Sequence, residues 1–177
     1  DQYRIALGGI IHLSSGHRPQ FHRYNHPFNE CIVSNSGGKK DTLGLLSNIK
    51  TNVQKALTII QKINGNFNLQ KATMADFDHY QKHLPDEIAP YLYAAIKNHF
   101  ITQKADLELS KKKPDIRLLG QYMNEHHEVL KEQLKITTPK IDAMIECVMN
   151  QGAFGAKIVG SGGGGCIVVL APEQRHA

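Results

Sequence analysis

The segment KIVGSGGGGCIVVLAP, residues 157–172, places one serine and five glycines between two apolar runs. A glycine inside a regular element costs roughly 0.5 to 1 kcal/mol relative to alanine, so five of them require a reason. Either the backbone must adopt positive φ, or its N–H groups must approach an anion closely. A hairpin turn alone needs only two such residues. The sequence therefore favours a loop that binds a phosphate or a substrate, here called the glycine loop and made of Gly160, Ser161, Gly162, Gly163, Gly164 and Gly165.

The residues that flank the glycine loop argue against a flexible linker. Ile158 and Val159 precede the loop, and residues 166–170 follow it as the apolar run CIVVL. Flexible linkers are rich in glycine and serine and lie in polar surroundings. We therefore expect a strand on each side of the loop.

Apolar residues recur at helical spacing in five segments between the two ends of the chain. Thr138 followed by Pro139 is typical of an N-cap and a first helical position. Pro85 is expected to end the helical segment that begins at residue 73. We predict helices over residues 42–64, 73–84, 88–109, 118–134 and 138–152. The stripe of the first helix is expected to bury Leu43, Leu46, Ile49, Val53, Leu57 and Ile60.

The first 36 residues contain two apolar runs that favour strands, residues 5–13 and 30–34. Residues 14–27 between them are rich in turn formers and are expected to be anchored by Phe21 and Tyr24. The order of strands, helices and strands predicts an α+β fold, not a regular alternation of strand and helix.

The composition argues against nucleic acids and membranes as binding partners. The net charge is +5, but the basic residues are scattered and aromatic residues make up 7% with no tryptophan, so no nucleic-acid partner is indicated. No apolar run reaches the roughly 20 residues of a membrane-spanning helix, so no membrane partner is expected.

The cysteines indicate neither a disulfide framework nor a metal site. Cys31, Cys147 and Cys166 are odd in number and widely spaced. Their apolar neighbours favour buried thiols in a reducing, cytoplasmic compartment.

The histidines also predict no metal site. His79 and His83 share a helix face but lack a third ligand, so we expect both at the surface. His126 and His127 point about 100° apart on a helix and cannot easily hold one ion together. We expect one of this pair in the core and the other toward a cleft or solvent.

Three segments of the sequence resemble motifs of one protein family, and they occur in the same order as in that family. Residues 137–172 resemble the carboxy-terminal signature of the GHMP small-molecule kinases, a superfamily that includes galactokinase, homoserine kinase, mevalonate kinase and phosphomevalonate kinase. The glycine loop corresponds to the third motif of that family. Residues 119–130, LGQYMNEHHEVL, resemble the helix that comes before this motif, and residues 1–9, DQYRIALGG, resemble the segment that starts with the catalytic aspartate.

The resemblance implies a division into domains and roles for residues. Residues 1–36 would be the last strands of the amino-terminal catalytic domain, and residues 37–177 the ferredoxin-like carboxy-terminal domain, a sheet with packed helices. Asp1 would orient the substrate hydroxyl and accept its proton, and the glycine loop would lie beside the phosphates. ATP and Mg²⁺ would be cofactors held mainly by the amino-terminal domain.

One family motif is absent from the 177 residues. The ATP-binding loop, of the type Gly-Leu-Ser-Ser-Ser at a helix N-terminus, is expected upstream of Asp1. We therefore expect these residues alone to be inactive as a phosphotransferase.

The acceptor remains open. Asp1-Gln2 resembles galactokinase and the heptose and fucose kinases, whereas the GSGGGGC loop is closer to mevalonate kinases. We favour a galactokinase-like enzyme of carbohydrate metabolism that phosphorylates a sugar hydroxyl, because the residue beside the base contacts the acceptor more directly. A mevalonate kinase-like enzyme and a non-catalytic sugar sensor on the same fold are the alternatives.

Overall fold

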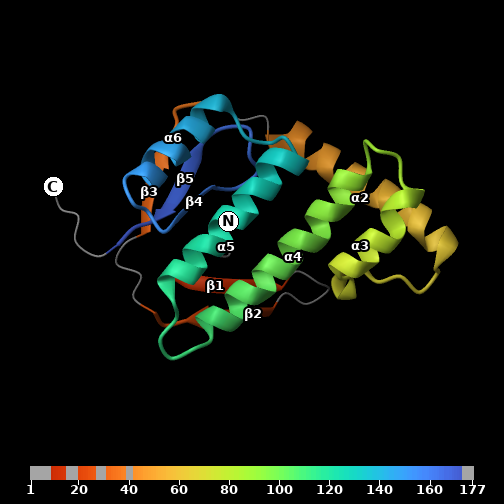
Figure 1. Cartoon of the computed structure of the whole chain (residues 1–177), viewed down its shortest axis with the longest axis horizontal. Helices are drawn as coiled ribbons and strands as arrows, with labels where there is room; N and C mark the ends of the chain where they lie inside the picture. Colours follow the sequence, from red (N-terminus) through yellow and green to blue (C-terminus); the bar gives the residue numbers. More distant parts are fainter. Residues whose placement is uncertain (1–8, 15–19, 27–30, 39–41, 173–177) are drawn as a thin grey trace.

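The computed structural model describes residues 9–14, 20–26, 31–38 and 42–172, which form two small sheets and a set of packed helices (Figure 1). The first sheet is an antiparallel pair of β1 (Ile10–Ser14) and β2 (Gln20–Tyr24). The second contains β3 (Cys31–Asn35), β4 (Gly155–Ile158) and β5 (Cys166–Leu170), with β5 in the middle and antiparallel to both neighbours. The α+β prediction is confirmed.

All five predicted helical segments are helical. They are α2 (Thr42–Ile63), α3 (Met74–Tyr80) with the 3₁₀ turn η2 (Gln81–His83), α4 (Ala89–Leu109), α5 (Ile116–Glu128) with the π-helical turn η3 (Val129–Gln133), and α6 (Pro139–Asn150). A further 3₁₀ turn, η1 (Leu69–Lys71), precedes α3. The side chain of Thr138 accepts a hydrogen bond from the N–H of Ile141, which confirms the predicted N-cap of α6.

Strand β2 was not predicted. Four of its five residues are exposed and only Tyr24 is buried, so the strand carries no apolar alternation that the sequence could reveal. Its partner β1 confirms the described part of the predicted first strand. The β1–β2 pair is attached to α4, because His12 Nδ1 lies 2.9 Å from Asp106 Oδ1 and the Tyr24 hydroxyl donates to the same oxygen.

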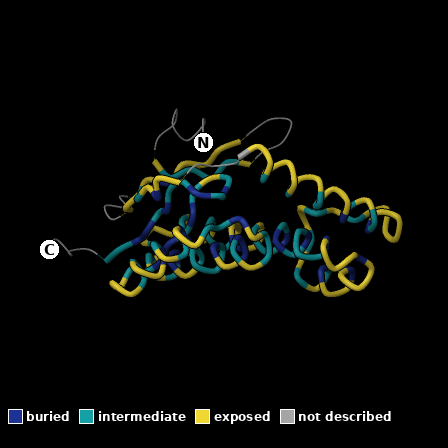
Figure 2. Tube along the Cα trace, turned by 90° about the horizontal axis from the view of Figure 1, so that it is seen from above, coloured by how far each residue is buried: buried dark blue, intermediate teal, exposed yellow. Residues whose placement is uncertain are grey.

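Two hydrophobic clusters form the centre of the molecule. One joins α2, α3 and α4 and includes Ala56, Ile60, Phe77, Leu92 and Ile96. The other joins α6 to the three-stranded sheet and includes Ile141, Ile145, Ala156, Ile158, Ile167 and Val169. Figure 2 shows these buried positions where helices meet the sheet and one another, while the long helix α2 is exposed along much of its length. Its predicted stripe is partly wrong: Leu43 is 84% exposed and Leu46 is 50% exposed, whereas Leu45 and Ile49 pack against the cluster of α6 and the sheet.

Strand β3 bears on the predicted division into domains. It lies within residues 1–36, yet it pairs with β5 along its whole length, from Cys31 opposite Leu170 to Asn35 opposite Cys166. This pairing favours a boundary before Cys31. The existence of two domains stays a prediction.

Candidate functional site

The glycine loop joins β4 to β5, and its backbone explains its composition. Val159 N–H donates to the carbonyl of Cys166 at 2.9 Å and closes the hairpin at the base of the loop. All five glycines have positive φ, with values of 79°, 84°, 71°, 121° and 86° at Gly160, Gly162, Gly163, Gly164 and Gly165. Side chains strongly disfavour this region, so positive φ, one of the two reasons offered for the glycines, applies to all five.

The loop is held in place on two sides. The N–H of Gly163 donates to the carbonyl of Ile136 at 2.7 Å, and a Cβ atom on Gly162 would lie 2.6 Å from the same oxygen. On the other side, the N–H of Ser36 donates to the carbonyl of Gly165 at 2.7 Å. The glycine loop is therefore a packed element with a defined shape.

This packing limits which N–H groups can meet an anion. The N–H of Gly163 is already bound to Ile136 and is not available to a phosphate. Within the described residues, the N–H groups of Gly162 and Gly164 have no backbone acceptor. The predicted phosphate contact of the loop stays a prediction, and the N–H groups of Gly162 and Gly164 are among the donors that remain available for it.

Residues at the end of β3 belong to the same site, and no role was predicted for them from the sequence. Ser36 is buried, with 3% of its surface exposed, and its Oγ accepts from the N–H of Gly38 at 3.2 Å. Asn35 Oδ1 accepts from the N–H of Gly37 at 2.9 Å, and Gly37 has a φ of 68°. The sequence signal was Asn-Ser-Gly-Gly after an apolar run, a side-chain-stabilised turn.

Helix α5 packs directly on β4, on the strand that leads into the glycine loop. A Cβ atom on Gly120 of α5 would overlap the carbonyl of Phe154, and one on Gly155 of β4 would overlap the carbonyl of Gly120. Only glycine at both positions allows this backbone contact.

Two side chains of α5 bind the free edge of β4. The N–H of Ala156 donates to Asn124 Oδ1 at 2.9 Å, and the N–H of Ile158 donates to His127 Nδ1 at 3.4 Å. Alternate N–H groups of a strand point away from its partner, so these two would otherwise be unpaired beneath α5. Helix α5 thus supplies the acceptors that a further strand would supply.

The contact continues from His127 to α6. His127 is 6% exposed, and burial lowers its pKa, which keeps the ring neutral and lets Nδ1 accept. Its Nε2 lies 3.7 Å from Asp142 Oδ1, while the Thr137 hydroxyl donates to Asp142 Oδ2 at 3.3 Å. Residues 136 and 137 are neighbours, so the segment that accepts the Gly163 N–H is tied to the same carboxylate.

The remaining histidine and cysteine predictions had mixed outcomes. His127 lies in the core and His126 lines a cavity, as expected for the adjacent pair. His79 and His83 are exposed, as expected. The prediction of buried thiols is wrong, because Cys31 and Cys147 are exposed and Cys166 is half-buried. Cys31 begins β3 at the edge of the sheet, and Cys147 lies on the solvent side of α6, so apolar sequence neighbours did not report burial.

Two further site predictions concern Asp1 and metals. Asp1 lies outside the described residues, so its role stays a prediction. Within the part of the chain that the structure describes, no three His, Cys, Asp or Glu side chains are grouped so that they could hold a metal ion.

Comparisons with known proteins agree with this fold. Residues 106–177 match the family described as GHMP kinases C terminal. A mevalonate kinase of Thermococcus onnurineus is 34% identical over 176 residues, which is 96% of this chain and 41% of that protein. A galactokinase of Enterococcus faecalis is 29% identical over 126 residues, 69% of this chain and 32% of that protein.

A solved structure supports the same fold. The galactokinase of Lactococcus lactis, solved in complex with galactose, superposes with a TM-score of 0.77 at 18% identity, covering 87% of this chain and 40% of that one. Residues 106–177 are thus a carboxy-terminal GHMP kinase domain, and the whole chain spans less than half the length of these relatives. No helix among the described residues is long and apolar enough to span a membrane.

Proposed function

We propose that the full-length protein carrying this chain transfers a phosphoryl group from ATP to an alcohol group of a small molecule. The observation that carries the proposal is the glycine loop, in which five positive-φ glycines form a loop packed between the end of β3 and Ile136. In phosphoryl transfer the protein mainly positions the reactants and stabilises charge spread over the phosphoryl oxygens. A preorganised loop with unpaired N–H donors suits that task.

Two parts of the chain would share the chemistry. The N–H groups of Gly162 and Gly164 would donate to phosphate oxygens, and their fixed orientation means that little reorganisation accompanies the reaction. Asp1 would accept a hydrogen bond from the acceptor hydroxyl and take its proton late in the reaction. Position therefore matters more than the basicity of this carboxylate.

The cofactors are proposed from the family. ATP would be held mainly outside these residues. Mg²⁺, when bound to ATP, would neutralise charge on the phosphates. The described residues offer no group of three metal ligands, so no step is assigned to such an ion in this chain. We also propose a cytoplasmic location, because three widely spaced cysteines form no disulfide framework in the sequence and fit a reducing compartment.

Two acceptor classes are each favoured by a specific observation. The Asp1-Gln2 pair resembles sugar kinases and favours a sugar hydroxyl, our first interpretation of the sequence. The alignment with a mevalonate kinase over 96% of the chain favours mevalonate. We propose both as candidates and leave the choice to a direct assay.

The assay measures ADP formation by the full-length protein with ATP, Mg²⁺ and one acceptor at a time: galactose, fucose, heptose 7-phosphate or mevalonate. We expect turnover with one class, and Asp1→Asn should lower that rate by about 10² to 10⁴ because the amide cannot take the proton. Sugar binding with no turnover on any acceptor would instead identify a sensor and overturn the proposal.

A further inference from the structure

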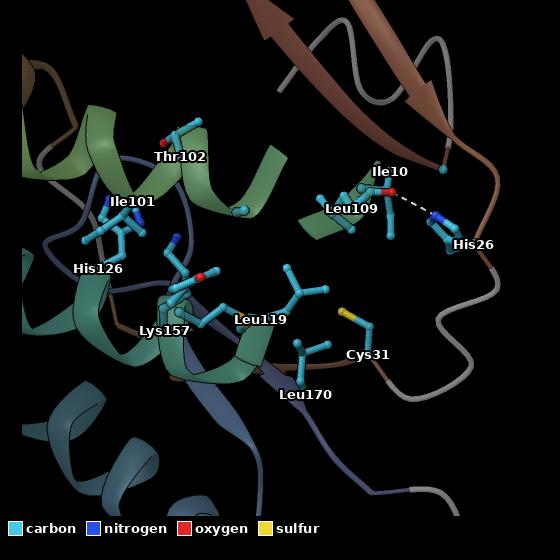
Figure 3. Close-up of a pocket in the computed structure, with 14 residues that line it drawn as sticks. Ile10, His26, Cys31, Ile101, Thr102, Leu109, Leu119, His126, Lys157 and Leu170 are labelled. Atoms are coloured by element: carbon cyan, nitrogen blue, oxygen red, sulfur yellow. Dashed lines mark hydrogen bonds between the residues drawn. The ribbon is translucent and has the colours of Figure 1, made fainter. Parts of the chain in front are cut away.

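Strand β1, helices α4 and α5 and the three-stranded sheet enclose a second candidate site. It is a cavity of about 840 Å³ (Figure 3). Its walls are mostly apolar and come from β1, α4, α5 and the sheet, with Ile10, Ile101, Leu109, Leu119, Met123 and Leu170 among the lining residues.

The cavity is separate from the glycine loop. It is lined by Cys31 and Leu170, which face each other at one end of the β3–β5 pair. The loop starts from the other end of that pair, where Asn35 faces Cys166. Four residues of strand separate the two ends, which corresponds to roughly 13 Å. This separation applies to the apolar end of the cavity; Lys157, at the other end, precedes Gly160 of the loop by three residues.

The polar part of the cavity is cationic. Lys157 and His126 both line it, and Figure 3 shows them together at one end, with Leu109 and Cys31 toward the other. The Lys157 Nζ donates to the carbonyl of Ile158 at 3.0 Å, and among the described residues no carboxylate lies within ion-pair distance of it. An ammonium group has three donors, so two remain for a ligand.

The apolar surroundings make a charged Lys157 energetically unfavourable unless an anion pairs with it. Burial lowers the pKa of Lys157, as expected for an ammonium removed from water into an apolar wall. His126 does not compete for an anion as a second cation at neutral pH, because burial and the neighbouring Lys157 lower its pKa to about 4. A buried charge is usually paired, and here the lining offers no acidic partner.

We propose that this cavity binds a small amphipathic anion, a carboxylate or phosphate monoester with a short apolar body. The head group pairs with Lys157, and the body packs against Ile101, Leu119 and Leu170. The proposal is independent of the kinase activity, since it concerns binding alone and rests on Lys157, which has no role in the proposed phosphoryl transfer.

Octanoate, octyl phosphate and 1-octanol serve as probes with the same apolar body and different heads. Binding to the full-length protein is measured by calorimetry, and contact with the cavity is checked by chemical shifts of labelled Met123. We expect both anions to bind more tightly than the alcohol. Lys157→Met should weaken anion binding by about tenfold or more, because a charged hydrogen bond is lost, and leave 1-octanol unchanged. The matched control is Lys113→Met, an exposed lysine between α4 and α5 that does not line the cavity.

A second variant keeps the test decisive if Lys157→Met fails to fold. Ala105→Phe places a ring into the cavity from α4 and should block all three probes. The preference between octanoate and octyl phosphate decides between the two anion classes. Equal binding of octanoate and 1-octanol to the unmodified protein overturns the proposal, as does anion binding that neither variant alters.

Discussion

The N–H of Ile158 in β4 donates a hydrogen bond to Nδ1 of His127 in α5 over 3.4 Å, so a helix side chain completes the edge of the strand that leads into the glycine loop. His127→Leu keeps the volume and removes the acceptor. We expect it to lower the free energy of unfolding by about 1–3 kcal/mol, the cost of a buried N–H without a partner. Chemical denaturation measures this loss.

The control for this prediction is His83→Leu, at an exposed position. It should change stability by less than about 0.5 kcal/mol. His127→Gln, whose amide oxygen can accept the hydrogen bond from Ile158, should lose less stability than His127→Leu. Equal losses in all three variants would show that the hydrogen bond does not stabilise the strand.

The backbone contact between Gly120 and Gly155 predicts that one added methyl group strongly lowers the stability of the fold. Gly120→Ala would force its Cβ into the carbonyl of Phe154, so α5 would have to move away from β4. We expect a loss of roughly 3 kcal/mol or more, measured by thermal unfolding. Gly65→Ala, where the nearest atom to the new Cβ is 4.0 Å away, should be neutral or slightly stabilising. A tolerated Gly120→Ala would refute the close packing.

Gly162 tests the shape of the glycine loop separately from its chemistry. Gly162→Ala adds a Cβ 2.6 Å from the Ile136 carbonyl at a φ of 84°. Gly37→Ala imposes a similar backbone cost at a φ of 68° but meets no atom within 4 Å. Gly37→Ala should therefore lower the free energy of unfolding by about 1–2 kcal/mol, and Gly162→Ala should lower it clearly more. Chemical denaturation measures both losses. Equal costs would indicate that the loop does not pack on Ile136.

His126 predicts a specific acid sensitivity. Its pKa in the folded protein is about 4, below the ordinary value of 6.5, so folding favours the neutral ring. The folded protein is then fully stable above pH 6.5 and loses stability as the pH falls toward 4. Over that range the unfolding equilibrium constant should rise about tenfold or more beyond its rise in His126→Gln. Parallel pH profiles of the two proteins would contradict the burial of this ring.

Much of the fold follows from local signals in the sequence. The helices α4 and α6 begin and end close to the predicted residues, because their apolar periodicity, prolines and caps are local. The positive φ values of the glycine loop were also predictable, since five glycines have few other uses.

The rest depended on tertiary partners. Strand β2 has too little apolar pattern to detect, and its only buried side chain, Tyr24, is fixed by Asp106 on a distant helix. The contact of Gly120 with Gly155 joins residues 35 positions apart and leaves no local trace. Likewise, the hydrogen bond of Gly163 to Ile136, which removes one predicted phosphate donor, depends on how α5 and α6 are joined.

The central claim is that the glycine loop serves phosphoryl transfer, and the rate of Gly163→Val in the full-length protein tests it most directly. A β-branched residue at a φ of 71° distorts the loop and blocks close approach of a phosphate. Turnover with ATP and the best acceptor is measured beside far-ultraviolet circular dichroism at the assay temperature. We expect a folded protein whose kcat/KM is lower by at least about 10², because transition-state contacts are lost. A folded variant with unchanged kcat/KM would contradict it and leave the loop as a structural turn.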